Sequence, residues 1–149
     1  MVSLIAAATS ASAGDPALNL RHGGSGASVD YSLEELQAMP STTFSTSTLW
    51  TEGVVEFTGV SLRDFLEMSE ITDGSLVATA INDYAVSIPV SDAVEGGPII
   101  AYAMNGAPMS RRDKGPLWIV YPFDSRSEYQ SETIYSRSIW QLNRIEAIE

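Results

Sequence analysis

Residues 99–122 read IIAYAMNGAPMSRRDKGPLWIVYP, and this stretch decides the fold class. Residues 99–104 form an apolar run of strand length, and Asn105-Gly106, which follows them, is the strongest short signal for a β-hairpin. Pro108-Met109 is therefore expected to pair back on the first strand. The continuous apolar run 117–121 predicts a further strand, which a proline ends. Strands thus dominate this part of the chain.

The flanking sequence predicts more strands and a few short helices. Ser32 with Glu35 and Ser61 with Asp64 have capping-box spacing, so a helix is expected to begin at each serine, and Pro40 ends the first one. Residues 41–48 favour extended or loop structure, and residues 123–134 favour an irregular one. Further strands are expected at residues 17–21, 54–57, 76–81, 84–88 and 139–148.

Two finer predictions concern a turn and the last strand. Ser91 is expected to cap a short helical turn that runs through Val94. Simple alternation along residues 139–148 predicts that one face carries Ile139, Gln141, Asn143, Ile145 and Ala147, and that the other carries Trp140, Leu142, Arg144, Glu146 and Ile148. The elements together predict an α+β domain that is mixed and strand-rich, with short helices.

The composition limits the chemistry. A chain of 149 residues fits one domain, and 44% hydrophobic with 18% charged residues is the profile of a globular protein. The chain contains no cysteine. Disulfides, thiolate nucleophiles, iron–sulfur clusters and cysteine-ligated metals are therefore excluded for this sequence.

The charge is large and uneven. The formal net charge is −11, which argues against nucleic acid as a partner because phosphate contacts need clustered Lys and Arg. Of the eight bases, all but Arg21 and Arg63 lie within residues 111–149. Such a concentration is consistent with a local anion site, and equally with ordinary solvated loops.

The N-terminus resembles an export signal. Residues 2–8 are apolar, and Ala11-Ser12-Ala13 has the small-x-small form of a signal-peptidase site, so residues 1–13 are expected to be a partial signal peptide. The alternative is a flexible Ala/Ser tail. Residues 14–149 are expected to form the single folded domain of an exported protein. No stretch is long and apolar enough for a membrane helix.

Several familiar sites are missing from the sequence. The single histidine, His22, lies in a Gly-rich segment and is expected to be structural or exposed, since a lone His without Cys makes a poor transition-metal site. No P-loop, G-x-G-x-x-G or G-x-S-x-G motif is present. The sequence thus offers no standard catalytic or nucleotide-binding motif.

Aromatic and polar side chains offer a binding site for a flat heterocycle. Trp and Tyr rings stack on such a ligand, and a carboxylate such as Asp83, Asp124 or Glu128 accepts two bonds from a pterin edge. Arg137, between Ser136 and Ser138, is a candidate donor. For every tryptophan the alternative is core packing, most strongly for Trp118 within its apolar run. The predicted ligand-binding residues are Thr48, Trp50, Asp83, Tyr84, Asp124, Tyr129, Ser136, Arg137, Ser138 and Trp140.

Four segments together resemble a known family. Residues 101–122 resemble the A-Y-x-M-N-G-x-P-L … G-x-P-L-R-L-x-x-P signature of the molybdopterin-binding domain of the sulfite-oxidase type. FTGVSLRDFLE (57–67), INDYAVSIPVSDA (81–93) and SRSIWQLNRIEAI (136–148) resemble its W-x-G-V-P-L-R-D-L-L, G-Y-x-x-S-[IL]-P-L-x-x-A and K-S-x-K-W-[LI]-x-x-I-E-V segments, in the same order. The resemblance implies that family's fold and a pterin cup.

Two departures from the family pattern bear on function. The family's redox members hold molybdenum through a cysteine upstream of the W-x-G-V segment, where this chain has FSTSTLW (44–50), and a hydroxyl does not replace a thiolate as a soft ligand. The resemblance also implies a phosphate-binding Arg at the position of Trp118. No catalytic residue and no metal are therefore expected, and the expected ligand is a tetrahydropterin-like or molybdopterin-like pterin.

The signal-like N-terminus, the size and the YSRSIWQL segment (135–142) of this chain resemble those of the short, cysteine-free periplasmic pterin-binding regulators within this family, so the resemblance implies a periplasmic location. That resemblance implies a sensor that regulates a membrane-bound diguanylate cyclase/phosphodiesterase, which makes and degrades cyclic-di-GMP. Two alternatives stay open: a divergent molybdopterin-dependent oxidoreductase, and a structural module that has lost its ligand. The first predicts molybdenum in natively purified protein, and the second predicts a hollow filled by the protein's own side chains.

Overall fold

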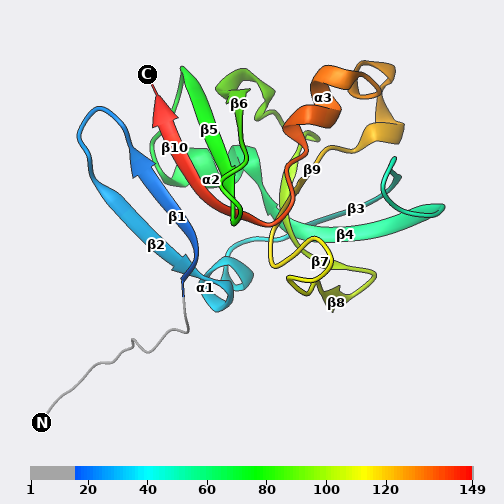
Figure 1. Cartoon of the computed structure of the whole chain (residues 1–149). Coiled ribbons are helices and arrows are strands. Elements are labelled where there is room, and N and C mark those ends of the chain that lie inside the picture. Colours follow the sequence, from blue (N-terminus) through cyan, green and yellow to red (C-terminus); the bar gives the residue numbers. More distant parts are fainter. Residues whose placement is uncertain (1–15, 149) are drawn as a thin grey trace, which may run out of the picture.

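The computed structural model describes residues 16–148, which form two β-sheets with short helices around them (Figure 1). One sheet has the strand order β2-β1-β10-β5-β6, built from β1 (Pro16–His22), β2 (Ser28–Ser32), β5 (Ser75–Ala80), β6 (Ala85–Pro89) and β10 (Leu142–Ile148). The other has the order β3-β4-β7-β8, with β9 also paired to β7; its strands are β3 (Thr42–Ser47), β4 (Val54–Ser61), β7 (Ile99–Met104), β8 (Ala107–Pro108) and β9 (Trp118–Val120). The predicted strand-rich α+β fold is confirmed.

The predicted hairpin after residue 104 is present. Asn105 and Gly106 have φ angles of +52° and +83°, as a two-residue turn between twisted strands requires, and Met104 pairs with Ala107. β7 also pairs with β4 and with β9. Residues 99–122, which begin with β7, therefore lie at the centre of the second sheet.

Helices begin where the serines predicted. Ser32 accepts a bond from the Glu35 amide and the Glu35 side chain accepts one from the Ser32 amide, so α1 (Leu33–Ala38) starts with a complete capping box. Ser61 accepts a bond from the Asp64 amide at the start of α2 (Leu62–Met68). A third helix, α3 (Glu132–Arg137), and the 3₁₀ turns η2 (Val90–Asp92), η3 (Phe123–Ser125) and η4 (Ser127–Tyr129) complete the fold.

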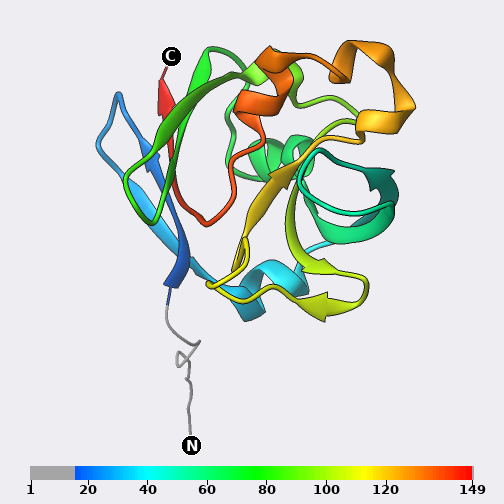
Figure 2. The same cartoon turned by 45° about the vertical axis from the view of Figure 1, so that its right-hand side comes forward.

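The buried apolar side chains of both sheets form one hydrophobic core. Phe57 of β4 and Leu76 of β5 are both fully buried members of that cluster. Trp118, also fully buried, meets Phe57 edge to face at 5.2 Å. The core interpretation of Trp118 is therefore correct. Figure 2 shows the segment that follows β9 rising over the second sheet and continuing into α3.

The structure corrects three local predictions. Pro89, and not Ser91, holds the N-cap position of η2, and no side chain caps that turn. Residues 28–32 form a strand and residues 132–137 a helix, neither of which was predicted. Ser131 caps that helix by accepting a bond from the Ile134 amide, which shows why a polar segment becomes helical here.

The last strand is shorter than predicted and its faces differ. Gln141 has φ +53°, and the register with β5 shifts between Leu142 and Arg144. Leu142 is therefore buried on the same side as Ile145, whereas simple alternation had placed them on opposite faces. The expected signal peptide lies outside the described residues, and within residues 16–148 no helix has the length and apolar character needed to cross a bilayer.

Candidate functional site

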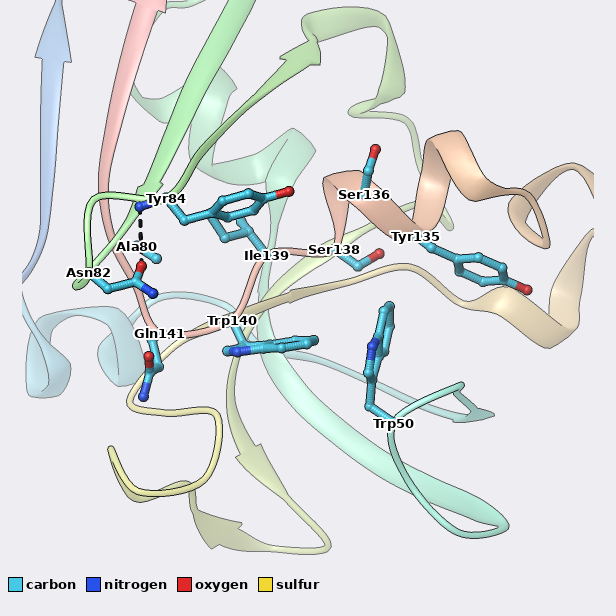
Figure 3. Close-up of a pocket in the computed structure, with 10 residues that line it drawn as sticks. All are labelled: Trp50, Ala80, Asn82, Tyr84, Tyr135, Ser136, Ser138, Ile139, Trp140 and Gln141. Atoms are coloured by element: carbon cyan, nitrogen blue, oxygen red, sulfur yellow. Dashed lines mark hydrogen bonds between the residues drawn. The ribbon is translucent and has the colours of Figure 1, made fainter.

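A hollow of about 380 Å³ opens where three segments meet (Figure 3). The β3–β4 loop contributes Trp50, the β5–β6 turn contributes Asn82 and Tyr84, and Ala80 lies at the end of β5. The segment from α3 to β10 contributes the rest: Tyr135, Ser136, Ser138, Ile139, Trp140 and Gln141. None of these ten side chains carries a charge, and most of them are aromatic or apolar, which is the usual character of a small-molecule site.

Trp50 stands at one end of the hollow and is held from several sides. Its amide donates to Thr48 Oγ1 at 3.0 Å, which fixes the loop. Its ring meets the rings of Trp140 at 5.3 Å, Trp118 at 5.9 Å and Tyr135 at 6.0 Å, always edge to face. This geometry is the favoured one for aromatic pairs, so the Trp50 wall is preorganised.

Tyr84 and Trp140 face each other across the open space. Figure 3 shows the Tyr84 ring on one side of the hollow and the Trp140 ring on the other. Tyr84 is 56% exposed, and it contacts no aromatic ring among residues 16–148, although four tryptophan and tyrosine rings nearby contact one another. A planar ligand between the two rings would gain a stacking partner on each face.

Polar atoms at the rim have unused hydrogen-bonding capacity. Asn82 Oδ1 accepts from the Tyr84 amide at 3.1 Å, which leaves its NH₂ group as a donor. The Gln141 side-chain NH₂ donates to the Arg111 carbonyl, which leaves Oε1 as an acceptor. Ser136 donates its hydroxyl proton to the Thr133 carbonyl at 2.7 Å and therefore can accept a bond from a ligand. The site thus offers neutral donors and neutral acceptors.

The wall formed by α3 is tied to the body of the protein at its C-terminal end. Trp118 Nε1 donates to the Ser138 carbonyl at 3.1 Å. One oxygen of Asp92 accepts both from Arg137, at 2.7 Å, and from the Tyr121 hydroxyl, at 2.8 Å. Burial of Tyr121, and then the adjacent Asp92 carboxylate, raise the pKa of its hydroxyl far above the usual range, so it stays a neutral donor.

The structure brings five of the ten predicted site residues together around this hollow. They are Trp50, Tyr84, Ser136, Ser138 and Trp140. Arg137 belongs to α3 between two of them, but its guanidinium is engaged by Asp92. Tyr129 is buried and packs on Tyr121 with ring centroids 5.4 Å apart.

The remaining three predicted residues lie elsewhere. Asp83 is exposed and pairs with Arg144 at 3.3 Å. Thr48 and Asp124 line a smaller neighbouring hollow of about 230 Å³, which shares Tyr135 with the first. Asp124 accepts from the Ser47 amide at 2.8 Å and from its hydroxyl at 2.7 Å, and these bonds lower the pKa of the carboxyl. Asp83 and Asp124 thus each have a protein partner, Arg144 and Ser47, that is far away in the sequence.

Sequence reasoning missed Asn82, Tyr135 and Gln141 as site residues. Asn82 belongs to the Asn-Asp turn and Tyr135 to a helix that was not predicted, so their directions follow from the fold. Gln141 immediately precedes β10 and has a left-handed backbone conformation, which no motif in the sequence signals. Only the break between the strands expected at 76–81 and 84–88, where Asn82 and Asp83 lie, could have drawn attention to Asn82.

The fold and the site together define the class of protein. The family profile described as "Oxidoreductase molybdopterin binding domain" matches residues 17–124, and the chain belongs to this family. Among solved structures it is similar to the sulfane dehydrogenase SoxCD from Paracoccus pantotrophus, with a TM-score of 0.66 and 17% identity. That similarity covers 87% of this chain but only 37% of the SoxCD chain, and it establishes the shared fold. No curated protein matches the chain.

The family's cofactor fits this site only in part. The slot between Tyr84 and Trp140 suits the pterin ring, and the neutral donors and acceptors suit its edge. The chain has no cysteine to supply a thiolate, and among residues 16–148 no group of three or more His, Asp or Glu is arranged to hold a metal. No cationic side chain lines the hollow to meet a phosphate. The residues present therefore match the ring and not the metal or the phosphate.

Proposed function

We propose that this chain is a non-catalytic pterin-binding protein that acts as a ligand sensor. The observation that carries the proposal is the uncharged slot between Tyr84 and Trp140, with Trp50 at its end. A half-exposed tyrosine without an aromatic neighbour, opposite an indole, is a stacking site with one component missing. In this proposal a flat bicyclic ring between Tyr84 and Trp140 is the missing component.

Hydrogen bonds at the rim orient the ring. A pterin edge presents an amino group and a ring N–H as donors beside a carbonyl acceptor. Gln141 Oε1 and Ser136 Oγ accept from the donors, and the Asn82 amide donates to the carbonyl. These partners are neutral, so the site favours an uncharged, unphosphorylated pterin of the tetrahydropterin type over a molybdopterin-type ligand.

The direct test is ligand-induced stabilisation. A pterin at 100 times its dissociation constant stabilises the fold by about 2.7 kcal/mol, which raises Tm by about 5–11 °C in a domain of this size. Reduced and oxidised pterins are screened by differential scanning fluorimetry, and positive ligands are titrated by calorimetry. Trp140→Ala should weaken binding at least about tenfold, because it removes one stacking face.

Met68→Ala is the matched control for that variant. Met68 is half exposed, lies at the end of α2 and does not line the hollow, so the change should leave pterin affinity unaltered. If no pterin raises Tm, or if Trp140→Ala and Met68→Ala bind equally well, the proposed function is wrong.

A second candidate is an oxidoreductase that carries molybdopterin, and membership of the family supports it. It requires molybdenum to be retained by ligands other than a thiolate. Metal analysis of protein purified from its native source separates the two candidates. A stoichiometric molybdenum content supports the oxidoreductase, and a metal-free pterin extracted from the protein supports the sensor.

The biological setting that we propose is the periplasm, with a membrane-bound diguanylate cyclase/phosphodiesterase as the regulated partner. The small-x-small motif at residues 11–13 supports export, and the similarity of the Tyr135–Leu142 segment to short periplasmic pterin-binding regulators supports the partner. In this proposal the sensor has two conformations that present different docking surfaces. Pterin binding would shift the equilibrium between them by the difference between their free energies of pterin binding.

A further inference from the structure

Unpaired positive charge is concentrated in one loop of this acidic protein. Among residues 16–148, four of the bases form ion pairs: Arg21, Arg63, Arg137 and Arg144. Arg126 lies over the Tyr129 ring. The other three, Arg111, Arg112 and Lys114, lie within four consecutive residues, and none forms an ion pair with a described acid; Lys114 Nζ lies over the Trp118 and Trp140 rings. We name residues 110–114 the basic loop.

The basic loop has a fixed backbone. The Asp113 amide donates to the Ser110 carbonyl at 3.1 Å, and the Gly115 amide donates to the same carbonyl at 2.8 Å. The Ser110 hydroxyl also donates to Asp113 Oδ2 at 3.2 Å. A side chain at Gly115 would place its Cβ 2.0 Å from the Met109 carbonyl oxygen, so the close approach requires glycine. The exposed arginines are therefore displayed on an ordered support.

Three contacts join this loop to the hollow. Gln141, a lining residue, donates its side-chain N–H to the Arg111 carbonyl and its main-chain N–H to the Lys114 carbonyl, the latter at 2.9 Å. Lys114 Nζ lies 5.3 Å from the centroid of the Trp140 ring. Figure 3 shows Gln141 beside the pale yellow loop. A ligand that moves Gln141 or Trp140 thus acts directly on the loop.

We propose that the basic loop docks an acidic segment of a partner protein, and that occupancy of the hollow changes this docking through Gln141; only the coupling rests on the proposed function. Arg111 and Arg112 are exposed and do not line the hollow. A ligand ring in the hollow therefore leaves these two side chains accessible to a partner. Guanidinium groups bind carboxylates in a bidentate manner, which suits Asp and Glu side chains.

The charge count favours an acidic protein over a membrane. Recognition of anionic lipid usually needs a cluster of about four to eight Lys or Arg, whereas this loop has three and includes Asp113. Because the net charge is −11, the rest of the protein surface repels an acidic partner. The basic loop therefore allows such a partner to bind and determines how it is oriented.

The test uses a fluorescein-labelled peptide of about eight glutamates as the probe, followed by anisotropy at about 20 mM and about 200 mM salt. The variant is Arg111→Gln/Arg112→Gln. The matched control is Arg21→Gln/Arg63→Gln, which removes the same charge from sites on β1 and α2. We expect a loss of about five- to tenfold in peptide affinity for the first pair, a loss below about twofold for the control, and weaker binding at the higher salt.

The coupling is measured by repeating the titration with saturating pterin. We expect peptide affinity to change by at least about threefold, and pterin affinity to change by the same factor when peptide is present, since coupling between two sites is reciprocal. Gln141→Ala should reduce that factor toward one. An unchanged peptide affinity overturns the coupling.

Other outcomes separate the remaining explanations. Absence of peptide binding, or equal losses in both double variants, overturns the docking site. Binding to vesicles with about 30% phosphatidylserine without peptide binding also overturns it, in favour of a membrane. Weaker pterin binding by Arg111→Gln/Arg112→Gln would make the loop a ligand subsite instead. If the wild-type protein binds peptide but no pterin, the proposed function fails and the docking site stands.

Discussion

Tyr84 and Trp118 show how position decides the role of an aromatic residue. Trp118 is fully buried, meets Phe57 and Trp140 edge to face, and donates its indole N–H to a main-chain carbonyl. Tyr84 is more than half exposed and meets no described ring. Trp118 therefore stabilises the fold, whereas Tyr84 leaves exposed the ring on which the proposed pterin would stack.

Substitution of these two residues should separate stability from binding. Tyr84→Ala should change the free energy of unfolding by less than about 0.5 kcal/mol and lower pterin affinity about tenfold. Trp118→Ala should cost about 3–5 kcal/mol, because it opens a cavity in the core. Urea denaturation and calorimetric titration measure the two quantities. A large stability loss for Tyr84→Ala would show that its ring is structural.

The hydrogen bonds of Asp124 explain part of the loss of folding stability at low pH. Its carboxylate accepts two hydrogen bonds from Ser47, and these lower its pKa in the folded state. A lowered folded pKa adds stability above the unfolded value of about 3.9, and this contribution disappears as the pH falls through the folded pKa.

Ser47→Ala removes the hydroxyl donor and should make the decline in Tm between about pH 5 and about pH 2.5 less steep. The effect should be small because Asp124 is exposed. Ser45→Ala, an exposed change on the same strand, is the control. An equally steep decline in Tm at low pH for the two variants would contradict this role of Asp124.

At the element scale, α3 is a short helix that depends on its tethers. Six residues are too few for an isolated helix to persist in water. Ser131 caps its start, Ile134 is buried, and Arg137 reaches Asp92 at its end. Because Tyr135, Ser136 and Ser138 line the hollow, these tethers also set the shape of the site.

Asp92→Ala should cost about 1–3 kcal/mol, because it leaves the buried Tyr121 hydroxyl and the Arg137 guanidinium without their shared acceptor. Pterin affinity should fall as well, since the α3 wall loosens. Asp83→Ala removes an exposed ion pair with Arg144 and should cost less than about 0.5 kcal/mol. Both are measured by urea denaturation, and equal costs would show that the Asp92 network does not hold α3.

At the scale of the whole molecule, the excess of acids should show in the response to salt. A net charge of −11 on a chain of this size implies self-repulsion in the folded state, which screening relieves. Tm should rise between about 20 mM and about 200 mM sodium chloride. Glucose at the same osmolality is the control, and a fall in Tm with salt would mean that the ion pairs outweigh the repulsion.

Local patterns in the sequence determined most of the secondary structure. The hairpin at Asn105-Gly106, the two helices that begin after Ser32 and Ser61, and the apolar strand around Trp118 each depend on contacts within a few residues. The fold class follows from these elements and from four family-like segments in order. The absence of cysteine likewise could be read directly from the chain.

Only the tertiary structure decided how the site is assembled. Trp50, Tyr84 and Trp140 come from three segments far apart in the chain, and the register shift between Leu142 and Arg144 determines which side chains of the last strand turn inward. Arg137 and Asp124 were predicted as ligand contacts, but nearer partners, Asp92 and Ser47, occupy them. Hydrogen bonds and aromatic contacts form between whichever groups the folded chain brings within a few ångströms, and separation along the sequence does not determine that distance.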